Sequence, residues 1–196
     1  GVSALPLDLQ RRVHGWPGMR SRDLVRLAVL TARQGDDDAQ GWPTAYFEPN
    51  HPGRLAAPLP SDPGVLLGTY ADLRNAADLD ADAIVSLCRV GSTEFAPGRV
   101  SPADHVEVRL IDKMGRDYNP HLSWVLEDAA AVVARLRDEG RRVLLHCVRA
   151  EHRTPAVALR YLLARGVDLD AAVAEVEATV AHPVDGPLWE EARNVR

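Results

Sequence analysis

A short segment around Cys147 constrains the fold of this chain more than any other feature of the sequence. An apolar run over residues 143–145 leads into His146 and Cys147. After five further residues, Arg153 and Thr154 open an amphipathic helical pattern. This order predicts a buried strand, a tight loop and the start of a helix. Because the first amides of a helix lack intrahelical partners and lie at the positive end of its dipole, such a loop can bind a dianion.

The residues of this loop predict a cysteine nucleophile beside a phosphoryl-binding arginine. The helix field, assisted by Arg153, favours the thiolate of Cys147, which is the nucleophilic form. The planar guanidinium of Arg153 can hold two phosphoryl oxygens, and its spacing lets it curl back over the loop toward the sulfur. Pro155 fits the first helical turn, where its missing N–H costs nothing. The alternative, a buried free cysteine in a strand–helix turn, leaves the register of His146, Arg153 and Thr154 unexplained.

A cysteine preceded by histidine, and followed by five residues and then arginine and threonine, is the signature of the cysteine-dependent protein phosphatases. The chain resembles their compact dual-specificity branch over roughly residues 62–185. The resemblance implies an α/β fold, with a central, mainly parallel sheet flanked by helices. It also implies a phosphomonoester hydrolase of the protein-tyrosine or dual-specificity phosphatase type, which acts through a phospho-cysteine intermediate and needs no cofactor. The expected substrate is a phosphorylated protein or a small phosphorylated metabolite.

The loop departs from the family pattern at two positions. Ala150 stands where the family usually has glycine, and alanine is tolerated there if its backbone keeps a negative φ. Glu151 adds a carboxylate that repels phosphate unless it points outward. Either departure favours an alternative function, a phosphatase-like module that binds phosphate without turnover. Arg149 and His152 make the rim basic if they face the mouth, and are otherwise exposed solvated charge. The predicted phosphate-binding residues are Val148, Arg149, Ala150, Glu151, His152 and Arg153.

Cleavage of a phosphate ester also requires a proton for the leaving oxygen, which a thiolate cannot supply. In the family an aspartate supplies it from the loop between a strand and the long helix, here residues 110–121. Asp112 matches the family position. We favour it as the general acid because a group at a strand end is held more rigidly than one in mid-loop. Asp117 is the alternative, and either residue can instead be a turn former.

Several further side chains near the loop have two interpretations each. His146 either orders the loop and tunes the thiolate, or is a core histidine. Thr154 either hydrogen-bonds the sulfur and eases its departure from the intermediate, or begins the helix, and both roles are compatible. Cys88 lies in an apolar run and is predicted to be inert packing. The remaining histidines lack a paired ligand spacing and are interpreted as surface or core residues: His14, His51, His105, His121 and His182.

The hydrophobic pattern predicts the order of elements around this loop. We expect strands over 65–70, 83–88 and 105–111, and helices over 71–79, 124–137, 155–165, 169–181 and 186–193. Residues 1–34 are expected to form a helical extension and 35–61 a Pro-rich linker or surface strap, before a phosphatase-like domain over 62–196.

The extension weakly resembles the tail of bacterial ADP-ribosylglycohydrolases. That resemblance implies fusion to or association with such a domain, a longer natural chain, and a nucleotide-like or ADP-ribose phosphate as an alternative substrate. An ordinary extension packed on the domain fits equally well.

Composition argues against several other classes of protein. The net charge of −5 argues against nucleic acid as a partner, because counterion release needs a basic face. The longest apolar run is far below a membrane span. The two cysteines lie far apart and no His/Cys cluster occurs, which favours a reducing cytoplasm and no metal. Basic residues are almost all arginine, with Lys113 the only lysine, which indicates a GC-rich, bacterial genome.

Overall fold

A computed structural model of the chain describes residues 53–88, 100, 104–108, 110–112, 119 and 121–194. The chain divides into two compact units, Gly1–Ala45 and Tyr46–Arg196, and the described residues all belong to the second. The helical extension expected over residues 1–34 and the alternative acid Asp117 lie outside the described residues. Both therefore stay predictions.

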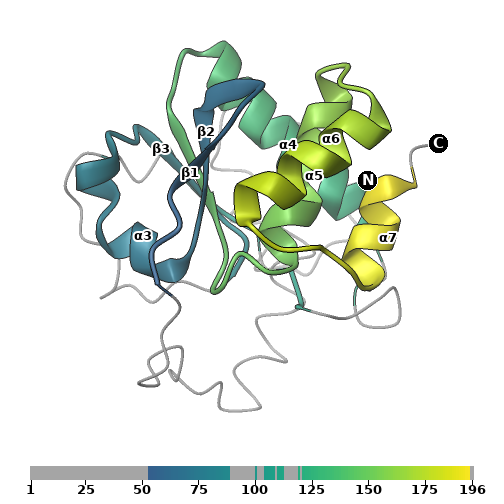
Figure 1. Cartoon of the computed structure of the whole chain (residues 1–196). Coiled ribbons are helices and arrows are strands. Elements are labelled where there is room, and N and C mark those ends of the chain that lie inside the picture. The colour runs from purple at the N-terminus through teal and green to yellow at the C-terminus, as the bar shows by residue number, and fades with distance from the viewer. Residues whose placement is uncertain are drawn as a thin grey trace, which may run out of the picture. The chain divides into compact units, whose positions relative to one another are not determined.

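The strands of the described residues form one five-stranded sheet in the order β1-β2-β5-β3-β4. They are β1 (Ala57–Leu59), β2 (Asp62–Gly68), β3 (Ala83–Ser86), β4 (His105–Glu107) and β5 (Val143–His146). β1 runs antiparallel to β2, and every other neighbouring pair is parallel. The expected central, mainly parallel sheet is confirmed, with β5 as its middle strand (Figure 1).

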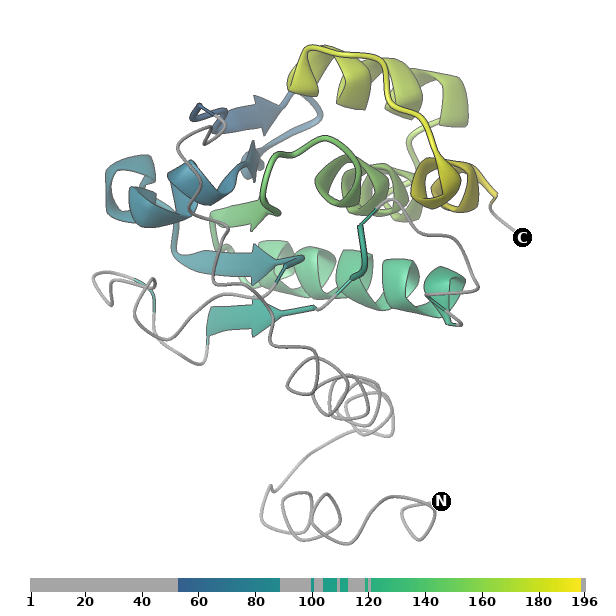
Figure 2. The same cartoon turned by 90° about the horizontal axis from the view of Figure 1, so that it is seen from below.

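Helices cover both faces of this sheet, as the α/β prediction requires. On one face lie α3 (Tyr70–Arg74) and the 3₁₀ helix η2 (Ala76–Leu79). On the other face lie α4 (Leu122–Asp138) and α5 (Arg153–Ala164). α6 (Leu169–Val180) and α7 (Pro187–Arg193) pack against α5 (Figure 1 and Figure 2). The boundaries of α4 to α7 lie within two residues of those expected from the hydrophobic pattern.

Two cores form because successive residues of a strand point to opposite faces of the sheet. The row Leu66, Leu144 and Ile84, one residue from each of β2, β5 and β3, belongs to the core under α3. The next row, one residue further along each strand, belongs to the larger core under α4 and α5. Both rows are buried, and this explains why β3 and β5 are apolar runs without alternation.

The helix expected over residues 71–79 is divided by Asn75 into α3 and η2. The side-chain amide of Asn75 donates a hydrogen bond to the carbonyl oxygen of Ala71 at 2.8 Å, and its backbone N–H donates to that of Asp72 at 3.0 Å. Asparagine competes in this way for backbone groups and ends the first helix. The strand expected over 105–111 is likewise shorter, because the pairing of β4 with β3 ends at Glu107.

The antiparallel strand β1 lies in a range where the sequence predicts a linker or strap. The segment that leads into β1 is held by Asp72 on α3, and the Asp72 side chain is fully buried. The Asp72 carboxylate accepts hydrogen bonds from the backbone N–H groups of Leu55 at 2.9 Å and Ala56 at 3.1 Å. It also accepts one from the backbone N–H of Thr69 at 2.8 Å, and so joins the chain before β1 to the start of α3.

At the amino end of the sheet, Asp62 joins β2 to two helices. Its carboxylate accepts a two-point contact from Arg137 on α4, with Nε at 2.9 Å and Nη2 at 2.8 Å. The hydroxyl of Tyr161 on α5 and the backbone N–H of Gly64 donate to the same carboxylate. Burial raises the pKa of Asp62, but the hydrogen bonds from Arg137 and Tyr161 outweigh it and hold that pKa below its ordinary value. This cluster fixes α4 and α5 to the sheet.

Candidate active site

The segment around Cys147 forms the strand, loop and helix start that its sequence predicts. β5 ends at His146, which is fully buried, and α5 begins at Arg153. The loop is fixed on two sides: the N–H of Tyr70 donates to the carbonyl oxygen of Val148 at 3.1 Å, and the N–H of Leu87 donates to that of His146 at 2.8 Å. The loop therefore sits at the carboxyl edge of the parallel strands, where open α/β sheets bind ligands.

Ala150 has a φ of 58°, so its backbone is left-handed and the condition of a negative φ is not met. For an alanine this conformation costs about 1 kcal/mol. It also aims the N–H of Ala150 at the sulfur of Cys147, at an N–Sγ distance of 3.2 Å. Cys147 is itself 2% exposed, so this hydrogen bond is shielded from water. The strained residue thus supplies a donor to the sulfur.

Arg153 is the first residue of α5, and its side chain points toward the segments that follow β3 and β4. Its Nη1 donates to the carbonyl oxygens of Leu87 and Leu110, at 3.3 Å each. Its Nη2 lies 3.4 Å from Oδ2 of Asp112. The guanidinium is almost completely buried and is held by two backbone carbonyls. The other terminal nitrogen of Arg153, Nη2, points toward the carboxylate of Asp112.

Asp112 lies five residues beyond the end of β4, so it is not at a strand end as the sequence predicts, but it lies beside Arg153. Its side chain is 40% exposed, and its Oδ1 atom is buried without a hydrogen-bond partner among the described residues. The neighbouring residue Ile111 is held by Asn119, whose side-chain amide accepts from the N–H and donates to the carbonyl oxygen of Ile111, both at 3.2 Å. Sequence reasoning gave Asn119 no role, because only the folded loop brings it back to Ile111.

Thr154 is fully buried, and its hydroxyl oxygen makes no hydrogen bond to any described residue. The expected bond to the sulfur of Cys147 is therefore not formed in this structure. A buried hydroxyl without a partner is costly, so a group that can use it is favoured in the site.

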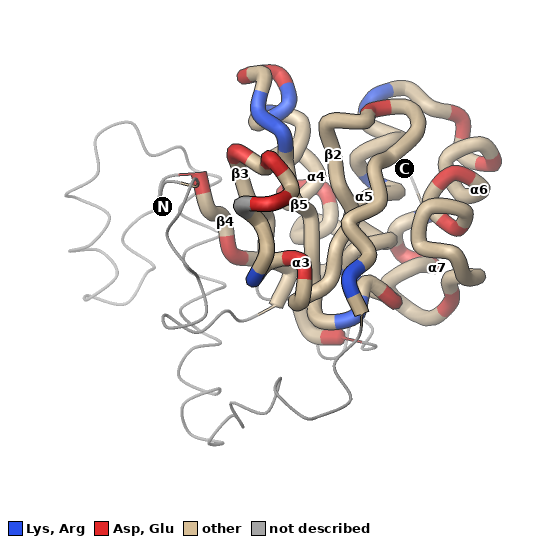
Figure 3. The backbone as a smooth tube through the Cα atoms, turned by 60° about the vertical axis from the view of Figure 1, so that its left-hand side comes forward, with Lys and Arg blue, Asp and Glu red and all other residues tan. Residues whose placement is uncertain are grey.

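The charged residues of the rim pair with each other. Nε of Arg149 lies 3.5 Å from the carboxylate of Glu151, and both side chains are about half exposed. The carboxylate that the sequence places near a phosphate site is thus partly neutralised by its neighbour. Away from the loop, α6 carries Asp170, Glu175 and Glu177 and no basic residue, and Figure 3 marks its acidic positions. That helix offers no attraction to a phosphate group.

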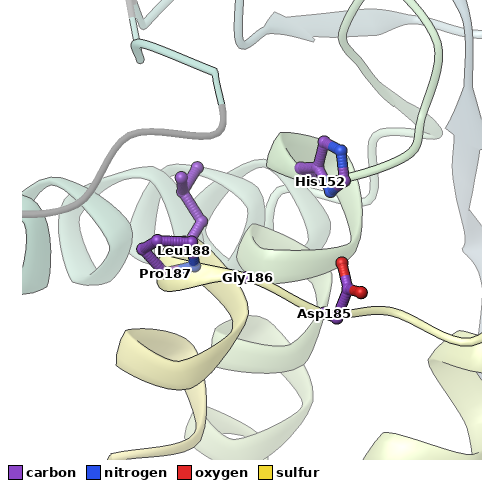
Figure 4. A pocket seen from close by; sticks show the side chains of 5 residues that line it. All are labelled: His152, Asp185, Gly186, Pro187 and Leu188. Carbon is purple, nitrogen blue, oxygen red and sulfur yellow. The ribbon is translucent and has the colours of Figure 1, made fainter.

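His152 lies beside a cavity of about 220 Å³ that adjoins the loop. The other lining residues come from the segment between α6 and α7 and from the start of α7: Asp185, Gly186, Pro187 and Leu188. Figure 4 shows the carboxylate of Asp185 directed toward the imidazole of His152. His152 is the one residue of the loop among the described residues that line this cavity.

His146 lies in a line of hydrogen bonds that the sequence does not reveal. Its Nε2 is 2.6 Å from Oγ of Ser86, and this Oγ is 2.8 Å from Nε2 of His105. Its Nδ1 is 3.2 Å from the carbonyl oxygen of Cys147. Burial lowers the pKa of His146 to about 4, so the ring is neutral at physiological pH. His146 thus contacts the loop, and His105 is connected to the site.

Cys88 is a free, buried cysteine two residues beyond the end of β3. Burial raises the pKa of its thiol, which keeps it protonated. No three His, Cys, Asp or Glu side chains within the described ranges gather as metal ligands would. No helix in the same ranges is long and apolar enough to cross a membrane.

No family model and no curated protein matches the sequence. Solved structures match the fold. Human DUSP28 superposes with a TM-score of 0.53 at 21% identity, over 70% of this chain and 95% of that one. The human tyrosine phosphatase-like serine/threonine/tyrosine-interacting protein gives 0.52 at 15%, over 67% and 89%. The Cydia pomonella PTP-2 phosphatase gives 0.51 at 16%, over 66% and 83%. These similarities show that the chain has the dual-specificity phosphatase fold.

Proposed function

We propose that this chain is a cysteine-dependent phosphomonoester hydrolase of the protein-tyrosine and dual-specificity phosphatase type. The proposal rests on the convergence of three groups at one edge of the sheet. They are the buried thiol of Cys147, the guanidinium of Arg153 and the carboxylate of Asp112, which lies 3.4 Å from that guanidinium. Phosphoester hydrolysis through a covalent intermediate needs a nucleophile, a cation that holds the phosphoryl oxygens and a proton donor.

Substrate binding uses groups that are already oriented. The phosphoryl oxygens are held by the amides of the loop and of the first turn of α5, together with Arg153. Nη1 of Arg153 is tied to two backbone carbonyls, so its Nη2 edge turns from Asp112 to the substrate at little cost. When Arg153 leaves Asp112 for the substrate, the Asp112 carboxylate can take up the proton that it later donates to the leaving oxygen.

The first chemical step forms the S–P bond and breaks the P–O ester bond. The sulfur of Cys147 attacks phosphorus, and Asp112 donates its proton to the leaving oxygen. In the second step Asp112 takes a proton from water, the water oxygen bonds to phosphorus, and the S–P bond breaks. The N–H of Ala150 stabilises charge on the sulfur in both steps, and the hydroxyl of Thr154 is available as a second donor. The products are an alcohol and inorganic phosphate, with no cofactor consumed.

The substrate is a phosphorylated protein or a small phosphorylated metabolite. Its organic part extends into the cavity beside His152, opposite the carboxylate of Asp185. The rim supplies little net charge because Arg149 and Glu151 pair. Recognition beyond the phosphoryl group therefore depends on the shape and polarity of that cavity.

A second candidate, a module that binds phosphate without turnover, is favoured by one observation. Ala150 holds a left-handed backbone without the freedom of glycine, which weakens the cradle. One protein of the same fold, at 15% identity, is itself named as phosphatase-like and interacting. The intact set of Cys147, Arg153 and Asp112 argues for hydrolysis.

The deciding experiment measures hydrolysis of an aryl phosphate and, separately, binding of vanadate. Wild-type protein should release phosphate, and Cys147→Ser should lose at least about 10³-fold in kcat while keeping part of its vanadate affinity. Arg165→Lys is the matched control, because Arg165 is exposed and pairs with Asp138 away from the loop. Hydrolysis that survives in Cys147→Ser contradicts the covalent mechanism. Wild-type protein that binds vanadate without turnover supports the second candidate.

A further inference from the structure

We propose that His105 is a positioning residue for the phosphoryl-binding loop, acting through Ser86 and His146 on the peptide group that follows Cys147. The proposal rests on the proposed function for its kinetic readout. It concerns a residue that the sequence pattern assigns only to the surface or the core. Its evidence is a continuous line of hydrogen bonds across three neighbouring strands, β4, β3 and β5.

The three side chains lie on one face of the sheet because of the strand register. Ser86 is paired with His146, and His105 is paired with Ile84, two residues before Ser86. Residues two apart on a strand share a face, so all three side chains face the side that α3 covers. Tyr70 at the start of α3 packs edge-on against the ring of His146, with ring centroids 6.5 Å apart. Ser86 and His146 are thus enclosed between sheet and helix, and His105 on β4 is partly buried.

The direction of each hydrogen bond follows from the acceptor at one end. The carbonyl oxygen of Cys147 can only accept, so Nδ1 of His146 carries a proton. The ring of His146 is neutral, so its Nε2 has a lone pair and accepts the hydroxyl proton of Ser86. The oxygen of Ser86 then accepts from His105, whose Nε2 must carry a proton. Conversely, a donor at His105 leaves the Ser86 proton free for Nε2 of His146, and so favours this tautomer of His146.

The selected tautomer fixes the first peptide group of the loop. In a trans peptide the C=O and N–H bonds point in opposite directions. A donor held on the carbonyl oxygen of Cys147 therefore sets the direction of the next N–H, that of Val148. The carbonyl oxygen of Val148 is fixed in turn by the N–H of Tyr70. Both peptide groups beside Val148 are thus held at the base of the cradle.

Without a donor at position 105 the opposite tautomer becomes accessible. Nε2–H of His146 can then donate to Ser86, which leaves a lone pair on Nδ1 facing the carbonyl oxygen of Cys147. Two lone pairs at 3.2 Å repel, so the peptide group rotates and the cradle loosens. A histidine retained only for packing would have no such effect on the loop.

Charged groups from three elements surround the network. Glu107 on β4 raises the pKa of His105, although burial lowers it more. Asp72 on α3 and Arg153 on α5 act on His146 in opposite directions. Protonated His105 carries a proton on Nε2, and neutral His105 does so in the tautomer that donates to Ser86, so the hydrogen bond can be kept in either form. The positioning role should therefore hold across the working pH range.

The test compares His105→Phe, which keeps a ring but removes the donor, with His105→Gln, whose amide nitrogen can donate to Ser86. We expect His105→Phe to lower kcat toward an aryl phosphate about tenfold with little change in KM, as a misplaced catalytic group does. The rate at which iodoacetamide alkylates Cys147, followed from pH 5 to 9, should fall by a similar factor at neutral pH. His105→Gln should recover both values to within about twofold.

Ser86→Ala provides the second arm, with Thr179→Val as its matched control. Thr179 loses a comparable hydroxyl, which donates to the carbonyl oxygen of Glu175 on α6. Ser86→Ala should show the defect of His105→Phe, Thr179→Val should not, and combining Ser86→Ala with His105→Phe should add nothing further.

The alkylation arm needs no turnover, so it tests the network even if wild-type protein hydrolyses no phosphate. The proposal is overturned if folded His105→Phe keeps the wild-type alkylation profile. It is also overturned if His105→Gln behaves as His105→Phe, because the donor would then be irrelevant.

Discussion

Two of the arginine–aspartate pairs lie at opposite ends of the same sheet, and they are built differently. At the amino end Arg137 holds Asp62 with two contacts of 2.8 and 2.9 Å, and Tyr161 and Gly64 add further donors. At the carboxyl end Arg153 approaches Asp112 with a single contact of 3.4 Å, and the other carboxylate oxygen has no partner among the described residues. The first pair is saturated and the second is open.

We interpret the Arg137–Asp62 pair as a contribution to stability and the Arg153–Asp112 pair as a contribution to function. A pair whose hydrogen bonds are all used can only hold elements together, and it gains from short, fixed geometry. A pair that must release both partners to a substrate cannot be saturated in the free protein. The carboxyl end also holds the strained Ala150 and the hydroxyl of Thr154, which has no partner among the described residues. The strain at Ala150 and the unused hydroxyl of Thr154 support the proposal that this end of the sheet binds a substrate.

The largest expected effect comes from making the same substitution in both pairs. Arg153→Lys should lower kcat/KM by about 10²–10³-fold, because an ammonium cannot make a two-point contact with the phosphoryl group. Its unfolding free energy should also fall, because Nη1 of buried Arg153 donates to two backbone carbonyls, so the activity is compared on folded protein. Arg137→Lys should leave the activity of the folded enzyme intact and cost about 2 kcal/mol of stability, since a charge-assisted contact to Asp62 is lost.

Steady-state kinetics and urea unfolding of both variants check this contrast. If Arg153→Lys were mild in activity, Arg153 would lie outside the site. If Arg137→Lys lost activity while still folded, the two ends of the sheet would not be independent.

Acid should weaken the two ends in different pH windows. The pKa of His146 is about 4 in the folded state against an ordinary 6.5. Between these values the unfolded chain binds more protons, so stability is complete above 6.5 and is lost as the pH falls toward 4. A gap of about 2.5 pH units corresponds to at most about 3 kcal/mol. Asp62 has a lowered pKa, so its contribution is lost only below about 3.8.

The unfolding free energy, measured with urea at each pH, should therefore fall in two separate pH windows. A variant can assign each window to one residue. His146→Asn should remove most of the slope between pH 6.5 and 4 and leave the part that the lowered pKa of His105 contributes, and Asp62→Asn should remove only the slope below that range. A wild-type slope that persists in His146→Asn would assign the upper window to another group, such as His105.

Asp112 is expected to control the alkaline limb of the pH–rate profile. The acidic limb reports ionisation of thiolate and substrate, and the alkaline limb reports loss of the proton of the acid. Asp112→Asn should lower kcat by about 10²-fold and flatten the alkaline limb. Asp117→Asn is the direct comparison, because Asp117 is the alternative acid. If Asp117→Asn flattens the limb and Asp112→Asn does not, the assignment is wrong.

The parts of the site that follow from local spacing were predictable, and those that depend on distant contacts were not. Cys147 and Arg153 are brought together by one strand, one loop and one helix, and the sequence specifies all three. Ser86 and His105 join them only because β3 and β4 pair in one register, and no local pattern encodes that register. The sequence therefore predicts Cys147 and Arg153, the proposed nucleophile and phosphate-binding residue, but not the hydrogen-bond network behind them.

The same distinction applies to the fold. Helices α4 to α7 were predicted because each has its own apolar periodicity. β1 was not predicted, because contacts distant in sequence hold it in place. It pairs with β2, and the buried carboxylate of Asp72 binds the backbone just before it. The sequence set a negative φ as the condition under which alanine is tolerated at position 150, and the structure does not meet that condition. The residue type favours a negative value, and closure of the loop between His146 and α5 outweighs that preference.

The charge of Glu151 should give a smaller effect that depends on salt. A carboxylate near a bound dianion costs roughly 1 kcal/mol even when partly screened. Glu151→Gln should therefore raise the rate toward an aryl phosphate a few-fold at low salt, and the gain should fade as the Debye length shrinks. Glu139→Gln is the control, because Glu139 pairs with Arg135 on the exposed side of α4. A lower rate in Glu151→Gln would mean that its pairing with Arg149 orders the loop.

The smallest effect concerns the strained backbone at Ala150, and the chain supplies its own control. Ala150 and Ala181 have nearly the same left-handed φ, 58° and 61°, but Ala181 ends α6 away from the loop. Glycine removes about 1 kcal/mol of strain at either position and loses about half of it to the greater freedom of the unfolded chain. Both substitutions should therefore stabilise the protein by about 0.5 kcal/mol in urea unfolding.

Only Ala150→Gly should also raise kcat, because only there does the left-handed backbone aim an N–H at the sulfur of Cys147. That gain should be indifferent to ionic strength, which distinguishes it from the effect of Glu151→Gln. If Ala150→Gly stabilises the chain and leaves kcat unchanged, the methyl group of Ala150 does not limit the rate of catalysis in the loop. If Ala181→Gly raises kcat equally, the gain is general to the fold and does not belong to the site.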